Sequence, residues 1–156
     1  MNTASYWFLG SRLTILADSG DTDGRYDLIE GWFPAGMQTP LHRHTRYQEQ
    51  LFVIEGEFTV RVGKSILVLT PGQTAIIPMG EAHCIAATGG GPARGLVVAP
   101  PSGFARVISG SAVPDINGQP VAKEANMALF TQLSKEVGDE ILGPPGTYPD
   151  GEMDAN

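Results

Sequence analysis

Short runs of apolar or alternating residues follow one another from residue 12 to residue 99, and turn-forming residues separate them. The runs are rich in Val, Ile, Leu and Phe, and pairs such as Asp23-Gly24, Glu55-Gly56 and Pro71-Gly72 lie between them. This pattern is typical of short antiparallel strands joined by tight turns. It predicts an all-β fold, a sandwich or a barrel, because no strand alternates with a helix. The predicted strands are 12–16, 26–33, 48–54, 58–62, 65–69, 75–77, 83–86 and 94–99.

After Pro101 the pattern changes from strands to helices. Residues 102–109 are compatible with a short helix capped by Ser102. A second helix follows Asn126, which can cap its N-terminus, and ends at Gly138, which can adopt the left-handed conformation that terminates helices. Its apolar stripe consists of Leu129, Phe130, Leu133 and Val137. We expect both helices to pack outside the β body.

Length and charge limit the class of protein. The 156 residues suffice for one domain, which we assign to residues 1–143 with a helical extension at about 102–138; residues 144–156 resemble a loose tail. A net charge of −7 argues against nucleic-acid and anionic-membrane partners. The single cysteine, Cys84, forms no intrachain disulfide, and the N-terminal residues lack the pattern of a signal peptide or a membrane span. We therefore expect a cytoplasmic protein.

The chain has only three histidines, and two of them are two positions apart. On a strand, His42 and His44 project from the same face and can bind one metal ion. Glu49 follows His44 after an odd number of positions, so a bend within residues 45–48 is needed to bring its carboxylate to the same centre. The strand that Glu49 opens would then carry Leu51 and Val53 on the same face.

The third histidine, His83, follows a predicted strand and a Pro-Met-Gly turn. Three imidazoles and one carboxylate suit Fe, Mn, Co, Ni, Cu or Zn, and this ligand set does not select among them. We expect one divalent transition-metal ion per chain.

Two segments together resemble a known family. Residues 36–56 read Gly36-x5-His42-x-His44-x4-Glu49-x6-Gly56, and residues 72–83 read Gly72-x5-Pro78-x-Gly80-x2-His83, with fifteen residues between the segments. They resemble, in order, the two signature motifs of the cupin superfamily. The resemblance implies a double-stranded β-helix, or jelly-roll barrel, with His42, His44, Glu49 and His83 as metal ligands. Ala87 departs from the pattern, because the second motif usually ends in Asn at this position.

Four segments outside the two motifs show a weaker resemblance to a group within this family. The segments YWFLG, DTDGRYDLIE, PSGF and LSKEVGDEILGPPG resemble small single-domain bacterial cupins described as quercetin-dioxygenase-like. This implies an oxygenase in which Glu49 is a metal ligand, a catalytic base or both. The inward-facing neighbours are expected to be apolar and to form a pocket for a small aromatic or enolisable hydrophobic substrate. These pocket residues are Leu51, Val53, Phe58, Val60 and Ile85.

Two other classes of function remain open. The same barrel can act as a non-catalytic, metal-dependent binder or sensor of small molecules, and the metal can serve a Lewis-acid isomerase or lyase. Cupins commonly dimerise through N-terminal strands, so we expect a homodimer through the apolar segment Ser5–Leu9. The sequence leaves open whether the C-terminal helix forms a lid over the pocket or only supports the barrel.

Overall fold

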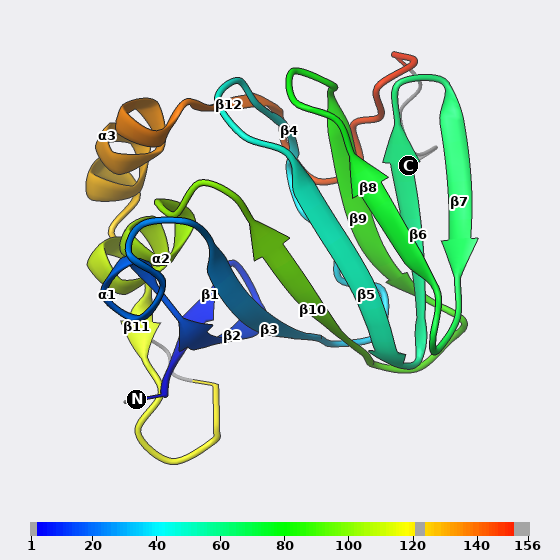
Figure 1. The fold of residues 1–156 in the computed structure, drawn as a ribbon. Helices are drawn as coiled ribbons and strands as arrows, with labels where there is room; N and C mark the ends of the chain where they lie inside the picture. The colour runs from blue at the N-terminus through cyan, green and yellow to red at the C-terminus, as the bar shows by residue number, and fades with distance from the viewer. Residues whose placement is uncertain (1–2, 121–123, 152–156) are drawn as a thin grey trace.

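Two antiparallel sheets face each other, and the interior of the molecule lies between them (Figure 1). The computed structural model describes residues 3–120 and 124–151. The larger sheet has the strand order β11-β1-β2-β3-β10-β5-β8, and the smaller has the order β12-β4-β9-β6-β7. The strands are β1 (Ala4–Phe8), β2 (Ser11–Ala17), β3 (Asp27–Phe33), β4 (Leu41–His44), β5 (Glu49–Glu55), β6 (Glu57–Val62), β7 (Ser65–Leu69), β8 (Thr74–Ile77), β9 (His83–Thr88), β10 (Ala93–Ala99), β11 (Val113–Pro114) and β12 (Asp139–Gly143). The helices are α1 (Ser19–Thr22), α2 (Phe104–Ser111) and α3 (Met127–Val137).

The predicted all-β class with C-terminal helices is confirmed. Each of the eight predicted strands is present, with ends within two residues of the expected positions. The eight predicted ranges do not include β1 or β4, although the arguments for N-terminal pairing and for His42 and His44 treated both segments as strands. The pattern did not predict α1, β11 or β12 at all. Helix α1 and strand β11 are only four and two residues long, and β12 begins directly after Gly138, the residue that ends α3.

Alternation along the strands determines which side chains face the interior. Along β3, the side chains of Ile29 and Phe33 are buried, and along β5 the buried ones are Glu49, Leu51 and Val53. The rings of Phe33 and Phe58 meet edge to face, with centroids 5.4 Å apart. Fully burying a side chain of this size stabilises the fold by about 1.5–3 kcal/mol, so this interior is the main source of stability.

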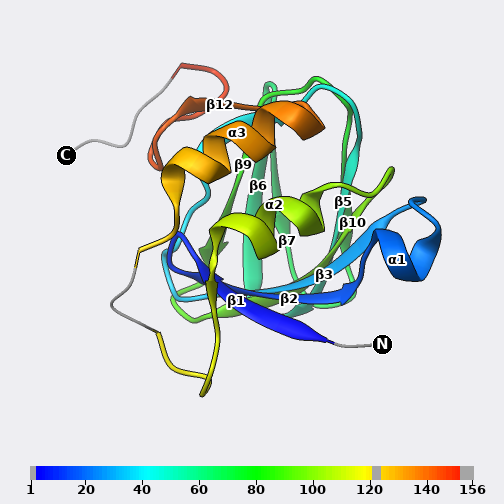
Figure 2. The ribbon, with the colours of Figure 1, turned by 90° about the vertical axis from the view of Figure 1, so that its left-hand side faces the viewer.

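Helices α2 and α3 pack against each other at one side of the molecule (Figure 2). They approach closely at Gly110, where a Cβ atom would lie only 2.6 Å from Leu133 Cδ1. Helix α3 is capped as predicted: the backbone N–H of Leu129 donates to Asn126 Oδ1, and Gly138 ends the helix with φ of 89°. The predicted cap of α2 is wrong.

Helix α2 begins at Phe104, and the carboxylate of Asp27, which is distant in the sequence, caps its N-terminus. The backbone N–H groups of Gly103 and Ala105 both donate to Asp27 Oδ2 at 2.8 Å, and the Ser102 hydroxyl donates to the same carboxylate. Asp27 is fully buried at the start of β3. A buried carboxylate requires hydrogen-bond donors, so Asp27 takes the capping role that the sequence pattern assigned to Ser102.

The N-terminal strand lies near one end of the larger sheet. Strand β1 pairs with β2 along its whole length, while β11 pairs only with Tyr6 and Trp7. Phe8 turns inward, and its ring centroid is 5.0 Å from that of Phe130 on α3. The segment expected to form a dimer is therefore already partly packed within one chain.

The C-terminal residues fold back on the smaller sheet. The guanidinium carbon of Arg61 lies 4.1 Å from the ring centroid of Tyr148, a cation–π contact. Of the expected tail, residues 152–156 lie outside the described part of the chain.

Within the described residues, the structure contains no helix that is both long enough and apolar enough to span a membrane.

Candidate metal centre

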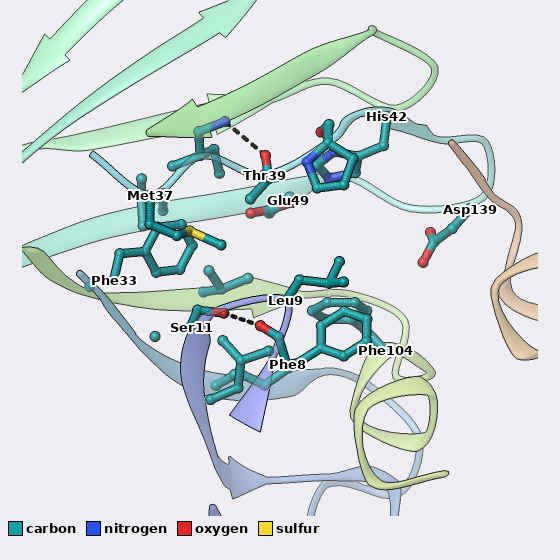
Figure 3. A pocket seen from close by; sticks show the side chains of 18 of the residues that line it. Phe8, Leu9, Ser11, Phe33, Met37, Thr39, His42, Glu49, Phe104 and Asp139 are labelled. Atoms are coloured by element: carbon teal, nitrogen blue, oxygen red, sulfur yellow. Dashed lines mark hydrogen bonds between the residues drawn. The ribbon is translucent and has the colours of Figure 1, made fainter. Parts of the chain in front are cut away.

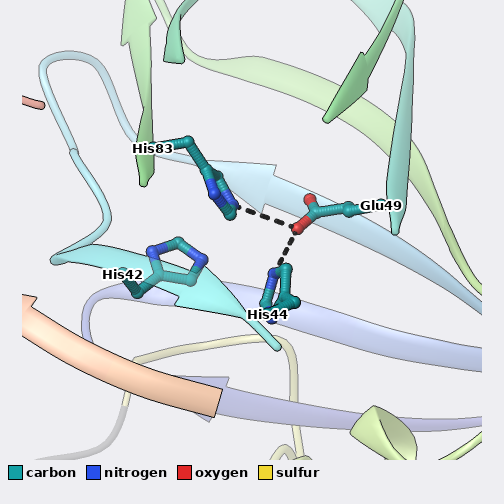
Figure 4. A group of neighbouring side chains, drawn as sticks. All are labelled: His42, His44, Glu49 and His83. Carbon is teal, nitrogen blue, oxygen red and sulfur yellow. Dashed lines mark hydrogen bonds and ion pairs between the residues drawn. The ribbon is translucent and has the colours of Figure 1, made fainter. Parts of the chain in front are cut away.

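All three histidines and Glu49 converge at one point between the sheets (Figure 4). Their potential ligand atoms all lie within 4.8 Å of one another. His42 and His44 are on β4, Glu49 is the first residue of β5, and His83 is the first residue of β9. The chain bends after His44 within residues 45–48, as the odd spacing to Glu49 requires.

Backbone carbonyl groups orient two of the imidazoles. His42 Nδ1 donates to the carbonyl oxygen of Pro40 at 2.7 Å, and His83 Nδ1 donates to that of Glu81 at 3.0 Å. A carbonyl oxygen can only accept a hydrogen bond, so Nδ1 carries the proton in both rings. The Nε2 atom of each ring is thereby left to bind a metal ion.

His44 is oriented by side chains instead. Its Nδ1 donates to Asp139 Oδ1 at 2.7 Å, and the Tyr47 hydroxyl donates to the same oxygen at 2.7 Å. The Tyr47 ring stacks on the imidazole, with centroids 4.3 Å apart and planes inclined by 25°. Neither Tyr47 nor Asp139 was predicted from the sequence as a partner of His44; the only signal for Asp139 is an acidic residue directly after Gly138, where the helix ends.

The inner face of the cluster fits a cation. Glu49 Oε2 lies 2.8 Å from His44 Nε2 and 3.5 Å from His83 Nε2. His83 is fully buried, and its Nε2 has no hydrogen-bond partner in the described structure. Buried polar atoms are rarely left unpaired, so an unpaired nitrogen that faces a buried carboxylate is an observation that a bound ion would explain. The donor set suits a divalent transition metal.

The charges in the cluster are strongly coupled. Burial lowers the pKa of His44, but hydrogen bonds to Asp139 and Glu49 outweigh this effect and raise the pKa to about 9. Burial, together with His83 and His44, lowers the pKa of His42 to about 3. Burial raises the pKa of Glu49, but the imidazoles of His44 and His83 outweigh it and hold the pKa well below its usual value. Glu49 is therefore ionised, and without a metal ion the balancing positive charge is on His44.

An apolar cavity of about 110 Å³ adjoins the cluster (Figure 3). This is several times the ~10–15 Å³ that one water molecule needs, so the cavity has room for a small organic molecule. His42, His44, Glu49 and Asp139 form its polar end. The apolar walls include Phe8, Leu13, Ile29, Phe33, Met37, Leu51, Phe58, Ile85, Val97, Phe104 and Phe130.

Three of the five predicted pocket residues line this cavity, namely Leu51, Phe58 and Ile85. Val53 and Val60 are fully buried but do not line it. Phe104 of α2 and Phe130 of α3 also contribute to the wall. The C-terminal helices therefore shape the cavity as well as supporting the barrel.

Comparison with known proteins identifies a domain in this chain. The model of the cupin domain matches residues 32–99, a segment that contains all four residues of the cluster. The chain contains a cupin domain. No curated protein matches this cupin.

Solved structures resemble this cupin in fold. An RmlC-like cupin from Shewanella frigidimarina has 23% identity and a TM-score of 0.55, with coverage of 64% of this chain and 83% of that one. KdgF from Halomonas sp. has 21% identity and a TM-score of 0.53, covering 59% and 79%. A recombinant oxalate oxidase in complex with glycolate has 27% identity and a TM-score of 0.52. Its match covers 60% of this cupin and 52% of the oxidase, so this cupin spans about half the length of that protein.

Proposed function

We propose that this cupin is a metal-dependent oxygenase for a small aromatic or enolisable hydrophobic substrate, similar in chemistry to a quercetin 2,3-dioxygenase. One observation carries the proposal: three residues of the His42, His44, Glu49 and His83 cluster, all except His83, line the polar end of a cavity whose walls are mostly apolar. A substrate of this kind would place its oxygen atoms at the cluster and its rings against the phenylalanine walls.

The similarity to oxalate oxidase supports oxidative chemistry on such a scaffold, since that protein is described as an oxidase. The ligand set supports it as well. Three histidines and one carboxylate leave coordination positions open on an ion that prefers five or six ligands. A bound divalent ion would supply Lewis-acid activation of a substrate oxygen and, for a redox-active metal, a route to dioxygen.

The residues of the chain have separate roles in this proposal. The Nε2 atoms of His42, His44 and His83, together with the Glu49 carboxylate, would hold the ion. Glu49 lines the cavity, so its carboxylate, once loosened from the ion, is placed to accept the hydroxyl proton of the substrate. The walls formed by side chains such as Phe33 exclude water from the reacting groups. Dioxygen is the oxidant, and both of its oxygen atoms enter the organic product.

The test uses metal-free protein loaded separately with Fe, Mn, Co, Ni, Cu and Zn. Oxygen consumption is then followed with a panel of flavonols and diketones, with Glu49→Gln as the matched variant. We expect turnover with at least one redox-active metal and its loss in the variant. Ligand-induced thermal stabilisation without product would indicate a binding protein. Turnover that persists without oxygen would indicate an isomerase or lyase.

We also propose that the protein forms a homodimer through Ser5–Leu9 and acts in the cytoplasm. The small extent of β11, which pairs with only two residues of β1, supports the first point, because most of the outer edge of β1 remains available for pairing. The single cysteine is compatible with a reducing compartment.

A further inference from the structure

Asp139 lies outside both histidine motifs and outside the segment that matches the cupin domain. It is nevertheless buried at the polar end of the cavity, and it accepts a hydrogen bond from His44 Nδ1 at 2.7 Å. We propose that Asp139 is a positioning residue of the metal centre, which holds His44 in the tautomer and orientation that present Nε2 to the ion. This inference rests on the metal site of the proposed function and is independent of the oxygen chemistry.

The three imidazoles are held in different ways. His42 and His83 each donate to the carbonyl oxygen of the residue two positions earlier, so their orientation is set within the local segment. His44 instead depends on a residue 95 positions away in the sequence. The partner of His44 Nδ1 is a carboxylate, whereas the partners of the other two rings are neutral carbonyl groups. A carboxylate partner makes an imidazole more basic and therefore a stronger metal ligand. His44 is therefore the one ligand whose orientation depends on the C-terminal segment.

The fold holds Asp139 at this position from both sides. In the pairing of β12 with β4, Asp139 lies directly opposite His44. The preceding residue, Gly138, accepts hydrogen bonds from the backbone N–H and the hydroxyl of Thr45, each at 2.8 Å. A Cβ atom at Gly138 would lie 2.7 Å from Arg46 Cγ, and φ there is 89°, so only glycine fits. The end of α3 is thereby fixed to the bend that follows His44.

A purely structural role for Asp139 is the competing explanation, since the Tyr47 hydroxyl donates to the same oxygen. The two roles can be separated. Tyr47→Phe removes the hydroxyl bond and keeps the ring that stacks on His44. Asp139→Ala removes both bonds. Asp139→Asn retains a side-chain oxygen that can accept from His44 Nδ1 but loses the negative charge.

The test measures Co²⁺ binding to metal-free protein without substrate. Affinity is determined by competition with a chelating indicator, the visible spectrum of bound Co²⁺ reports ligand geometry, and circular dichroism checks the fold. We expect Asp139→Ala to weaken binding by about 10- to 100-fold and to change the spectrum, as loss of such partners commonly does. Asp139→Asn should lie between that variant and the wild type, and Tyr47→Phe should bind like the wild type.

Wild-type affinity and spectrum in a folded Asp139→Ala protein would overturn the proposal. An equally large loss in Tyr47→Phe would also overturn it. Should Asp139→Ala fail to fold, Asp139→Leu decides, because it fills the space without offering an acceptor to His44 Nδ1, and wild-type Co²⁺ affinity and spectrum in that variant would overturn the proposal. If the wild type binds Co²⁺ but never consumes oxygen, the proposed oxygenase fails and the role of Asp139 stands.

Discussion

His42 and His83 are direct cross-strand partners on β4 and β9, and their ring centroids lie 4.2 Å apart. This is the only residue pair in the β4–β9 register within the described residues, so the two strands meet at the proposed metal site. An ion held by both rings, with Glu49 from β5, would connect strands of both sheets. The fold should therefore depend on the metal as well as position it.

Metal removal should lower thermal stability. A ligand that binds only the folded state stabilises it by about 2.7 kcal/mol when its free concentration is 100 times its Kd. We expect the melting temperature to fall when a chelator strips the protein and to recover when Co²⁺ or Zn²⁺ is added back. Differential scanning calorimetry measures this, and His83→Gln is the matched control, because its melting temperature should not respond to metal.

A single added methyl group should narrow the cavity. Gly31 lines the cavity, and its backbone is not left-handed, so alanine can adopt the same conformation. A Cβ atom there would lie 3.3 Å from Phe33 Cε1. An extra methyl group in packed space costs about 1–3 kcal/mol, so Gly31→Ala should weaken binding of the bulkiest aromatic ligands by about 5- to 100-fold. Isothermal titration with ligands of increasing size checks this.

Gly91→Ala is the matched control for the cavity variant. A Cβ atom at Gly91 meets no other atom within 4 Å, and its backbone is likewise not left-handed. Equal ligand affinities in the two glycine variants would mean that Gly31 does not limit the space for the ligand.

Much of the site was predictable because its signals are local. The spacing of His42, His44 and Glu49 encodes a shared face and a bend, and strand alternation predicts that Leu51 faces inward. Alternation does not predict whether other side chains cover an inward-facing residue. Val53 faces inward and is fully buried, but it does not line the cavity, and alternation alone could not predict this. Asp139 could not be assigned from spacing, because its partner is brought to it only by the pairing of β12 with β4.

The same limit explains the error at helix α2. Ser102 has the residue type and position of a cap, and local pattern favours it. Asp27 prevails because a fully buried carboxylate must find donors, and the backbone N–H groups of Gly103 and Ala105 are the donors within reach. Sequence proximity carries no information about that contact.

An ion pair should stabilise the N-terminal region in a pH-dependent manner. Arg12 donates to Asp115, and this bond, together with that from the Gly118 N–H, lowers the pKa of Asp115. A carboxyl group with a depressed pKa in the folded state stabilises the protein above its unfolded pKa, near 4, and loses this effect as pH falls through the folded value. The wild type should melt above Asp115→Asn at pH 6, and the difference should shrink towards pH 3. A difference that is constant with pH would contradict this assignment.

The oligomeric state tests the proposed pairing of N-terminal strands. Light scattering coupled to size exclusion should give twice the chain mass for the wild type and the chain mass after deletion of residues 1–9. Because Phe8 also contacts Phe130, Tyr6→Glu serves as a second variant that leaves this contact intact. A monomeric wild type, or a dimer that persists in both variants, would contradict pairing through Ser5–Leu9.

The central claim is that His42, His44, Glu49 and His83 bind one transition-metal ion. The most direct measurement is elemental analysis of protein purified without chelator, combined with anomalous diffraction at the absorption edge of the metal found. We expect close to one metal ion per chain and a single anomalous peak bounded by the three Nε2 atoms and the Glu49 carboxylate. Metal-free protein that also fails to take up any of the candidate metals, or a peak elsewhere in the molecule, would contradict it.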